Sequence, residues 1–211
     1  MSQAHEGGGP APIDELNDGF VEFCKSIADD DLARKRVEVS VITFGPDARV
    51  AIDFTEGRDL QPQSFTADGG TPLGAALNIA AEELTSQKQA YKDAGLLYYR
   101  PWLFVITDGA PTDADEFEKA AKRVRQMEAA KGVNVFAVGV GSQANLTELE
   151  KLSDARPPLR LKGLKFRELF QWLSSSMMSV SDSTPPAHDG EGGVEGEQLA
   201  LAPATWAEVA L

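Results

Sequence analysis

The stretch PWLFVITDG (residues 101–109) decides the fold. It is the most apolar run of the chain, and it ends abruptly at Asp108-Gly109. A continuous apolar run bounded by turn residues is typical of a strand that is buried on both faces of a parallel sheet. We therefore predict a central strand here. Asp108 stands at its carboxyl end, where ligands bind in sheets of this kind.

Further strands are predicted on either side of this one in the sequence. VNVFAVGVG (133–141) has the same continuous apolar character, and LRL (159–161) reads as a short edge strand. VEVSVITF (37–44) and ARVAIDF (48–54) are separated only by the turn residues Gly45 to Asp47. Because so short a link cannot carry a parallel crossover, this pair must form an antiparallel hairpin.

Helices are predicted between these strands from apolar residues at helical spacing. Their approximate ranges are 12–31, 71–92, 114–131, 146–152 and 165–178. Cys24 lies on the apolar face of the first helix, which predicts a core residue and not a reactive thiol. Asp113 is predicted to cap the 114–131 helix, and Gly132 to end it. Alternating strands and helices predict an α/β fold: a doubly wound, mostly parallel sheet with one antiparallel edge hairpin strand.

Composition narrows the class of function. The chain has 211 residues and a net charge of −13, which argues against binding DNA or an anionic membrane surface. No apolar run approaches the ~20 residues that span a bilayer. The single cysteine excludes an internal disulfide, so a cytoplasmic protein is expected. His5 and His188 lie in Gly- and Pro-rich stretches and do not form a zinc site with Cys24.

The composition changes after residue 178. We expect one domain over residues 1–178 and a disordered tail over 179–211, which is rich in Gly, Ser, Pro and acid. The last residues, LALAPATWAEVAL, are apolar again. They are either a frayed end, a docking peptide, or a strand or helix that packs back on the domain. A tail carboxylate such as Glu195 or Glu197 is a further candidate ligand within the chain.

Two short motifs carry the candidate chemistry. GGTPLGAAL (69–77) holds Thr71 at a helix start between Gly69-Gly70 and Pro72, and TDGAPTD places Asp108 and Gly109 at a strand tip. Each has a plain structural reading as well. Thr71-Pro72 is the sequence of an N-cap followed by an N1 proline, and Asp108-Gly109 is a common turn.

In this order, and with these strands between them, the two motifs resemble the von Willebrand factor A (VWA) domain. The resemblance runs from about residue 12 to 178, and it is nearest to an intracellular bacterial group that includes the tellurite-resistance protein TerY. The family builds a metal-ion-dependent adhesion site (MIDAS) on three loops at strand ends. Its pattern is Asp-x-Ser-x-Ser on the first loop, a Thr on the second and an Asp on the third. Here Thr71 and Asp108 match the second and third loops.

The resemblance implies a site for Mg²⁺ or another divalent cation. In the family, hydroxyl groups bind the metal directly, Asp groups act largely through water, and a partner's carboxylate fills the open position. Thr and Asp oxygens are hard ligands that suit Mg²⁺. The implied function is a non-catalytic protein-binding module whose partner offers an acidic side chain. The TerY-like context implies stress-response complexes with phosphatase or kinase partners.

The first motif of the family has no counterpart in this sequence. In the family, Asp-x-Ser-x-Ser follows a central strand and is commonly followed by Met. We therefore interpret Met1 as that methionine, and the chain as starting one strand late. Without a central strand, unpaired sheet edges would cost much of the stability, since each buried unsatisfied group costs ~1–3 kcal/mol. We expect the 211-residue chain to express poorly or aggregate, and to bind Mg²⁺ weakly.

Two alternatives stay open beside the metal-dependent module. One is a metal-independent scaffold of the same fold with a degenerate site. The other is a hydrolase or phosphotransfer enzyme. The sequence contains no G-x-x-x-x-G-K-[ST], no G-x-S-x-G and no histidine near a nucleophile, so no catalytic residue is assigned and an enzyme is not expected.

Overall fold

A computed structural model describes residues 11–142, 144–182 and 206–209. Residues 1–10, which include the Gly-rich loop, lie outside the described part, and so does most of the tail. Glu195 and Glu197, the tail carboxylates considered as ligands, are among the residues that are not described.

Helices and strands follow one another along the chain as the sequence predicts. The elements are α1 (Pro12–Asp29), α2 (Ala33–Arg36), β1 (Glu38–Phe44), β2 (Ala48–Glu56), α3 (Leu73–Asp93), β3 (Trp102–Thr107), α4 (Ala114–Ala129), β4 (Asn134–Val140), α5 (Leu146–Glu150), β5 (Leu159–Leu161), α6 (Phe166–Ser181) and β6 (Ala207–Val209).

The strands form two separate sheets. β1 and β2 form the predicted antiparallel hairpin, with Phe44 opposite Ala48 next to the turn. β3, β4, β5 and β6 form the second sheet in that order. β3 pairs with β4 in parallel, and β4 pairs with β5 in parallel. Two sheets in place of one continuous sheet is the main departure from the predicted fold.

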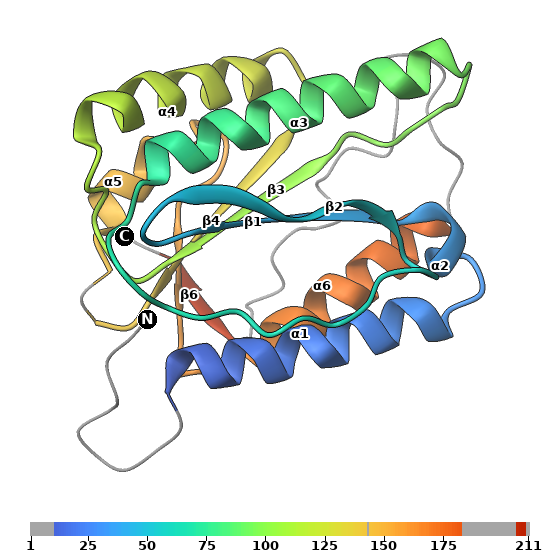
Figure 1. Cartoon of the computed structure of the whole chain (residues 1–211), viewed down its shortest axis with the longest axis horizontal. Helices are drawn as coiled ribbons and strands as arrows, with labels where there is room; N and C mark the ends of the chain where they lie inside the picture. Colours follow the sequence, from blue (N-terminus) through green and yellow to red (C-terminus); the bar gives the residue numbers. More distant parts are fainter. Residues whose placement is uncertain (1–10, 143, 183–205, 210–211) are drawn as a thin grey trace.

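Helices cover both faces of the strands (Figure 1). α1 and α6 pack against each other on one face, and α3 and α4 pack together on the other. Gly74 allows this second pair to approach closely, because a Cβ at that position would lie 2.3 Å from the backbone nitrogen of Phe117. One core cluster lies mainly between the strands and the helix pair α1 and α6. The other lies between the strands and the helix pair α3 and α4.

Burial differs sharply between strands of similar apolar composition. Every residue of β4 is buried, as predicted. All seven residues of β1 are only partly buried, and four of the six residues of β3 are as well. The prediction that β3 is buried on both faces is therefore wrong. The reason is that, among the strands in the described part of the chain, β1 and β3 each have a hydrogen-bonded neighbour on one edge only.

The end of the chain packs on the domain through β6. This strand is antiparallel to β5, with Ala207 opposite Leu161, and the amide of Lys162 donates to the carbonyl of Trp206 at 2.8 Å. Trp206 is 1% exposed, and its ring lies 5.4 Å from that of Trp172 on α6. Three alternatives were considered for the apolar end of the chain. The structure shows the one in which it forms a strand that packs on the domain.

Several element ends differ by a turn or less from prediction. α1 ends at Asp29 and α6 continues to Ser181. Gly95 follows α3 with a φ of 66°, as expected of a residue that ends a helix. After α4 it is Lys131, not Gly132, that takes the left-handed conformation, with a φ of 57°. Cys24 is a core residue as predicted, and burial raises the pKa of its thiol to about 11.

Trp206→Ala tests whether β6 is part of the domain. Removing this buried ring leaves a cavity against Trp172, so we expect the free energy of unfolding to fall by about 3 kcal/mol. Glu208→Ala is the matched control, because the Glu208 side chain is 66% exposed in the same strand. Urea unfolding at low protein concentration measures both variants. Equal stabilities of the two would contradict the packing of β6.

Candidate functional site

Thr71 stands just before α3, and its hydroxyl does not cap that helix. The N-cap position belongs to Pro72, and no side chain of that residue or of Thr71 bonds the first turn. The alternative structural reading of Thr71 as the N-cap of this helix is therefore wrong. The hydroxyl instead lies over Gly109, where an added Cβ would be 2.9 Å from the Thr71 Oγ1 atom.

The loop after β3 presents Asp108 at the same place. Thr107 is 2% exposed, and its Oγ1 accepts a hydrogen bond from the amide of Gly109 at 3.3 Å, which fixes the turn. Because Gly109 follows Asp108 directly and lies against Thr71, the structure brings the two predicted ligands to one edge of the domain. A side chain at position 109 would collide with the Thr71 hydroxyl, so this close approach requires glycine.

A second Thr-Asp pair in the same loop holds this edge together. The amide of Thr71 donates to Thr112 Oγ1 at 3.1 Å, and the amide of Thr112 donates to the Thr71 carbonyl at 2.9 Å. The Asp113 carboxylate accepts hydrogen bonds from the amides of Gly74 and Ala75 at 3.1 and 2.9 Å. Asp113 is the N-cap residue of α4, as predicted, but its side chain makes no bond there and caps the first turn of α3 instead.

The supporting residues Gly69, Gly70 and Pro72 all lie in the loop that leads into α3. Gly69 has a φ of 75°, and a Cβ there would lie 2.7 Å from the backbone nitrogen of Pro46. A Cβ at Gly70 would lie 3.1 Å from Thr112 Oγ1. These contacts bring the hairpin turn, the α3 loop and the β3 loop together.

The oxygen atoms at this edge are of the type that binds a hard cation, but they are few in number. Thr71 and Asp108 together offer a hydroxyl and a carboxylate, whereas Mg²⁺ takes six oxygens. Within the described residues no three of His, Cys, Asp and Glu gather closely enough to hold a metal. The two residues therefore fit part of a metal site, with the remaining positions left to water or to other groups.

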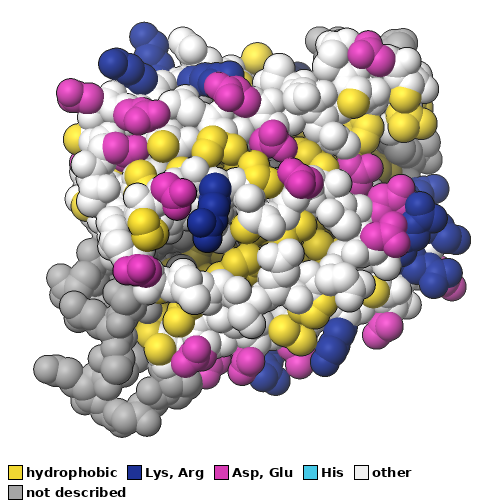
Figure 2. Space-filling view, in the orientation of Figure 1, with side chains coloured by type: hydrophobic (Ala, Val, Ile, Leu, Met, Phe, Trp, Pro, Cys, Tyr) yellow, Lys and Arg dark blue, Asp and Glu magenta, His cyan; other side chains and the backbone are white. Residues whose placement is uncertain are grey.

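A cavity of about 770 Å³ lies between β1 and β3 and opens beside this edge. We call it the β1–β3 cleft. Apolar side chains of α1 and α6 line one side, including Leu16, Phe20, Phe170 and Leu173, and α3 lines the other with Leu73, Ala76, Leu77 and Ala80. Hydrophobic side chains are visible in the hollow of the molecular surface between the hairpin and α1 (Figure 2). Sequence reasoning did not predict a cavity as such.

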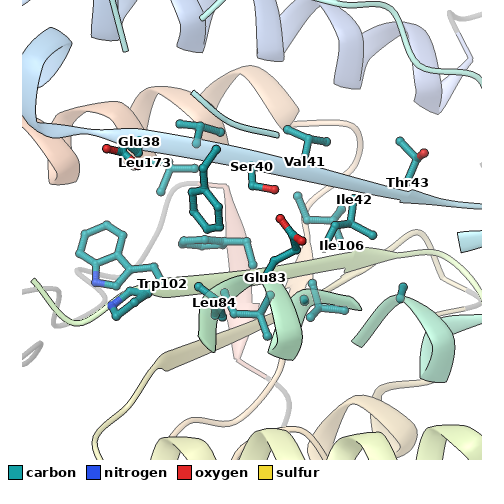
Figure 3. Close-up of a pocket in the computed structure, with 18 of the residues that line it drawn as sticks. Glu38, Ser40, Val41, Ile42, Thr43, Glu83, Leu84, Trp102, Ile106 and Leu173 are labelled. Atoms are coloured by element: carbon teal, nitrogen blue, oxygen red, sulfur yellow. The ribbon is translucent and has the colours of Figure 1, made fainter. Parts of the chain in front are cut away.

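β1 and β3 flank the cleft and run in the same direction. Glu38 and Trp102 lie toward one end of it, and Thr43 and Ile106 toward the other (Figure 3). At the amino end, Glu38 accepts hydrogen bonds from the Tyr91 hydroxyl at 2.5 Å and from Gln87 at 2.7 Å. Burial, followed by this carboxylate, raises the pKa of Tyr91 above its ordinary value. The loops that carry Thr71 and Asp108 line the carboxyl end.

Comparison with known proteins identifies the fold. The sequence pattern of the von Willebrand factor type A domain matches residues 17–162. Since this match spans more than half of the chain, the protein belongs to the von Willebrand factor type A domain family. The predicted family and fold class are thereby confirmed. The TerY-like subgroup is not established by the comparisons.

Individual relatives match the chain over limited lengths. The chain is 44% identical over 87 residues to the collagen alpha-5(VI) chain of Mus musculus, covering 40% of this chain and 3% of that protein. A von Willebrand factor type A structure from Catenulispora acidiphila superposes with a TM-score of 0.55 at 15% identity, covering 78% of this chain and 38% of the other. A manganese-loaded TRAP protein of Plasmodium vivax has a TM-score of 0.49 at 20% identity, over 69% of this chain and 55% of the other. The chain thus spans only part of each of these relatives.

None of the helices in the described ranges is long and apolar enough to cross a membrane.

Asp113→Ala tests the cap that holds the α3 loop. The variant leaves the amides of Gly74 and Ala75 without their acceptor, and we expect the free energy of unfolding to fall by about 1 kcal/mol. Asp115→Ala, at an exposed acid in the first turn of α4, is the control and should change stability by less than ~0.5 kcal/mol. Thermal unfolding of both variants measures the difference. A larger loss for the Asp115 variant would contradict the capping role.

Proposed function

We propose that this domain is a non-catalytic protein-binding module with a divalent-metal-dependent adhesion site. The observation that carries the proposal is the placement of the Thr71 hydroxyl. It does not cap α3, and it faces the loop of Asp108 at the carboxyl end of β3. That position is where ligands bind in α/β sheets. Mg²⁺ is the proposed ion, with Thr71 as a direct ligand and Asp108 acting through water.

The proposed partner is a protein that presents an acidic side chain. A metal held by two protein groups keeps coordination positions open, and a carboxylate oxygen is a ligand that Mg²⁺ favours. The net charge of −13 disfavours nucleic acid and anionic membranes as partners. The same charge would repel an acidic partner, which makes a bridging cation the physical requirement for such a contact.

The cellular setting is also a proposal. The resemblance to the TerY-like group favours a bacterial, cytoplasmic protein in a stress-response or tellurite-resistance complex, with phosphatase or kinase partners. The single, buried Cys24 is compatible with a reducing compartment. A metal-independent scaffold is the second candidate, and it is favoured by the absence of an Asp-x-Ser-x-Ser motif from the sequence.

Manganese titration distinguishes the two candidates, because bound Mn²⁺ broadens the NMR signals of nearby amides. We expect selective broadening at Thr71 and Gly109 that is reversed by excess Mg²⁺, with weak affinity because few ligands are present. Thr71→Ala removes one ligand, so we expect the affinity for Mn²⁺, measured by this broadening, to fall at least ~10-fold. A tenfold loss of affinity corresponds to about 1.4 kcal/mol.

Thr85→Ala is the control for the titration. Its hydroxyl donates to the Ala81 carbonyl within α3, away from the loops of the site. This variant should keep the affinity of the unmodified chain. Identical broadening in the Thr71 and Thr85 variants, or none in the unmodified chain, would favour the scaffold.

A further inference from the structure

β6 lies at the outer edge of the second sheet, although it comes from the far end of the chain (Figure 1). It has three residues, and its register places Ala207 opposite Leu161 on β5. The amide of Lys162 adds one bond, to the carbonyl of Trp206 at 2.8 Å. Because each backbone hydrogen bond contributes little net stability, so short a strand has to be held mainly by its side chains.

One side chain anchors this strand. Trp206 is buried, and its ring lies 5.4 Å from that of Trp172 on α6. Ala207 is buried as well, whereas the side chain of Glu208 is exposed and lies 4.0 Å from the Lys162 ammonium. The segment is therefore held as a peptide ligand is held in strand addition. Backbone bonds join it to a sheet edge, and one large side chain fills a pocket.

The pocket does not match the side chain that fills it. The indole Nε1 atom of Trp206 is buried and has no hydrogen-bond partner within the described residues. A buried Trp usually finds an acceptor for this N–H, and leaving the group unmatched is costly. An aromatic anchor of the same size without an N–H would therefore bind more tightly than the anchor of the chain itself.

The segment that leads to β6 is long enough to let it leave. Residues 183–205 join the end of α6 to Trp206, and a run of 23 residues extends to no more than ~80 Å. Lys162, the partner of Trp206, precedes the first turn of α6, a helix of 16 residues that is ~24 Å long. The segment has to return along one helix and has length to spare, so β6 can part from β5 without pulling on α6.

Charge and tethering decide which peptide can replace β6. A net charge of −13 makes two copies of the chain repel each other, which disfavours exchange of β6 between copies. Tethering holds the chain's own peptide near β5 at a millimolar effective concentration. A peptide of another protein therefore displaces it by fitting the pocket better, and the unmatched indole N–H leaves room for a better fit.

We propose that the outer edge of β5, with the pocket beside Trp172, is a docking site for an extended peptide of another protein. The chain's own residues 206–209 occupy this site when that peptide is absent. The peptide that fits runs antiparallel to β5 and has a large aromatic anchor, then a small residue, then an acidic residue that meets Lys162. The site involves neither Thr71 nor Asp108, so the proposal goes beyond the adhesion site and does not depend on metal binding.

The full chain with Trp206→Ala opens the site for a direct test. The probe is a peptide of residues 203–211, Pro-Ala-Thr-Trp-Ala-Glu-Val-Ala-Leu, with a fluorophore at its amino end, and binding is measured by anisotropy. We expect a Kd of ~10 μM for this variant and ~100-fold weaker binding to the unmodified chain, where the tethered peptide competes at ~1 mM. Equal binding to the two proteins would overturn the proposal.

Glu208→Ala is the matched control variant, because it changes an exposed residue of the same strand. Surface ion pairs contribute little, so this variant should exclude the probe as the unmodified chain does. Binding to the Glu208 variant as tight as to the Trp206 variant would contradict the anchoring role of the indole.

Two altered peptides test how the pocket recognises its ligand. Ala in place of Trp in the probe should abolish binding to the Trp206→Ala chain. 3-Benzothienylalanine keeps the fused rings of Trp but has sulfur in place of the N–H, so it should bind at least ~5-fold more tightly. Unchanged binding of the Ala peptide, or no gain with the benzothienyl peptide, would overturn the assignment of the pocket.

A cleavable link tests the site with Trp206 in place, should the Trp206→Ala variant fail to fold. A seven-residue protease site replaces residues 190–196 of the full chain, which is cut after folding. Dilution should release the tail fragment, the labelled peptide should take its place, and the buried β4 amides should stay protected from hydrogen exchange. A fragment that does not exchange with the peptide, or loss of β4 protection on its release, would make β6 an integral strand and overturn the proposal.

Sedimentation distinguishes a foreign peptide from a second copy of the chain. We expect the unmodified chain and the Trp206→Ala variant to sediment alike, because β6 stays within its own chain. A dimer that forms with rising concentration and that Trp206→Ala abolishes would overturn the proposal in favour of exchange of β6 between copies.

Discussion

Backbone hydrogen bonding at the middle of the fold is the constraint on which the rest of the structure depends. A strand within a sheet needs partners on both edges, and within residues 11–142, 144–182 and 206–209 β1 and β3 each have a strand partner on one edge. Buried polar groups without partners cost about 1–3 kcal/mol each, against a total stability of ~5–15 kcal/mol for a domain. All residues of β1 and four of the six residues of β3 are only partly buried, so apolar side chains of both strands stay partly exposed.

The cleft keeps its width because α3 bridges the two sheets. At the amino end, Gln87 and Tyr91 of α3 hold Glu38 of β1 by hydrogen bonds. At the carboxyl end, the loop before α3 lies against the hairpin turn on one side and is bonded to Thr112 on the other. α3 also packs along α4, which accompanies β3 and β4. α3 therefore sets the separation between the hairpin and β3. This explains why β1 and β3 do not pair with each other although both are apolar in sequence.

The sequence predicted what depends on local pattern. Continuous apolar runs located β3 and β4, the three-residue turn required an antiparallel hairpin, and Thr71 and Asp108 were placed together because strand ends share one edge. The errors concern contacts between distant segments. Asp113 is the N-cap residue of α4 as predicted, but its carboxylate bonds the first turn of α3, a contact between distant segments that local pattern does not predict. β6 has three residues and no periodic pattern, and only the burial of Trp206 explains its position.

The candidate site and the cleft are two consequences of the same loops. The amide of Thr71 bonds Thr112, and the amide of Gly109, next to Asp108, bonds Thr107, so these bonds hold the loops of the two candidate ligands at one edge of the domain. The small number of protein ligands limits the affinity of the candidate site, because one hydroxyl and one carboxylate bind a hard cation weakly.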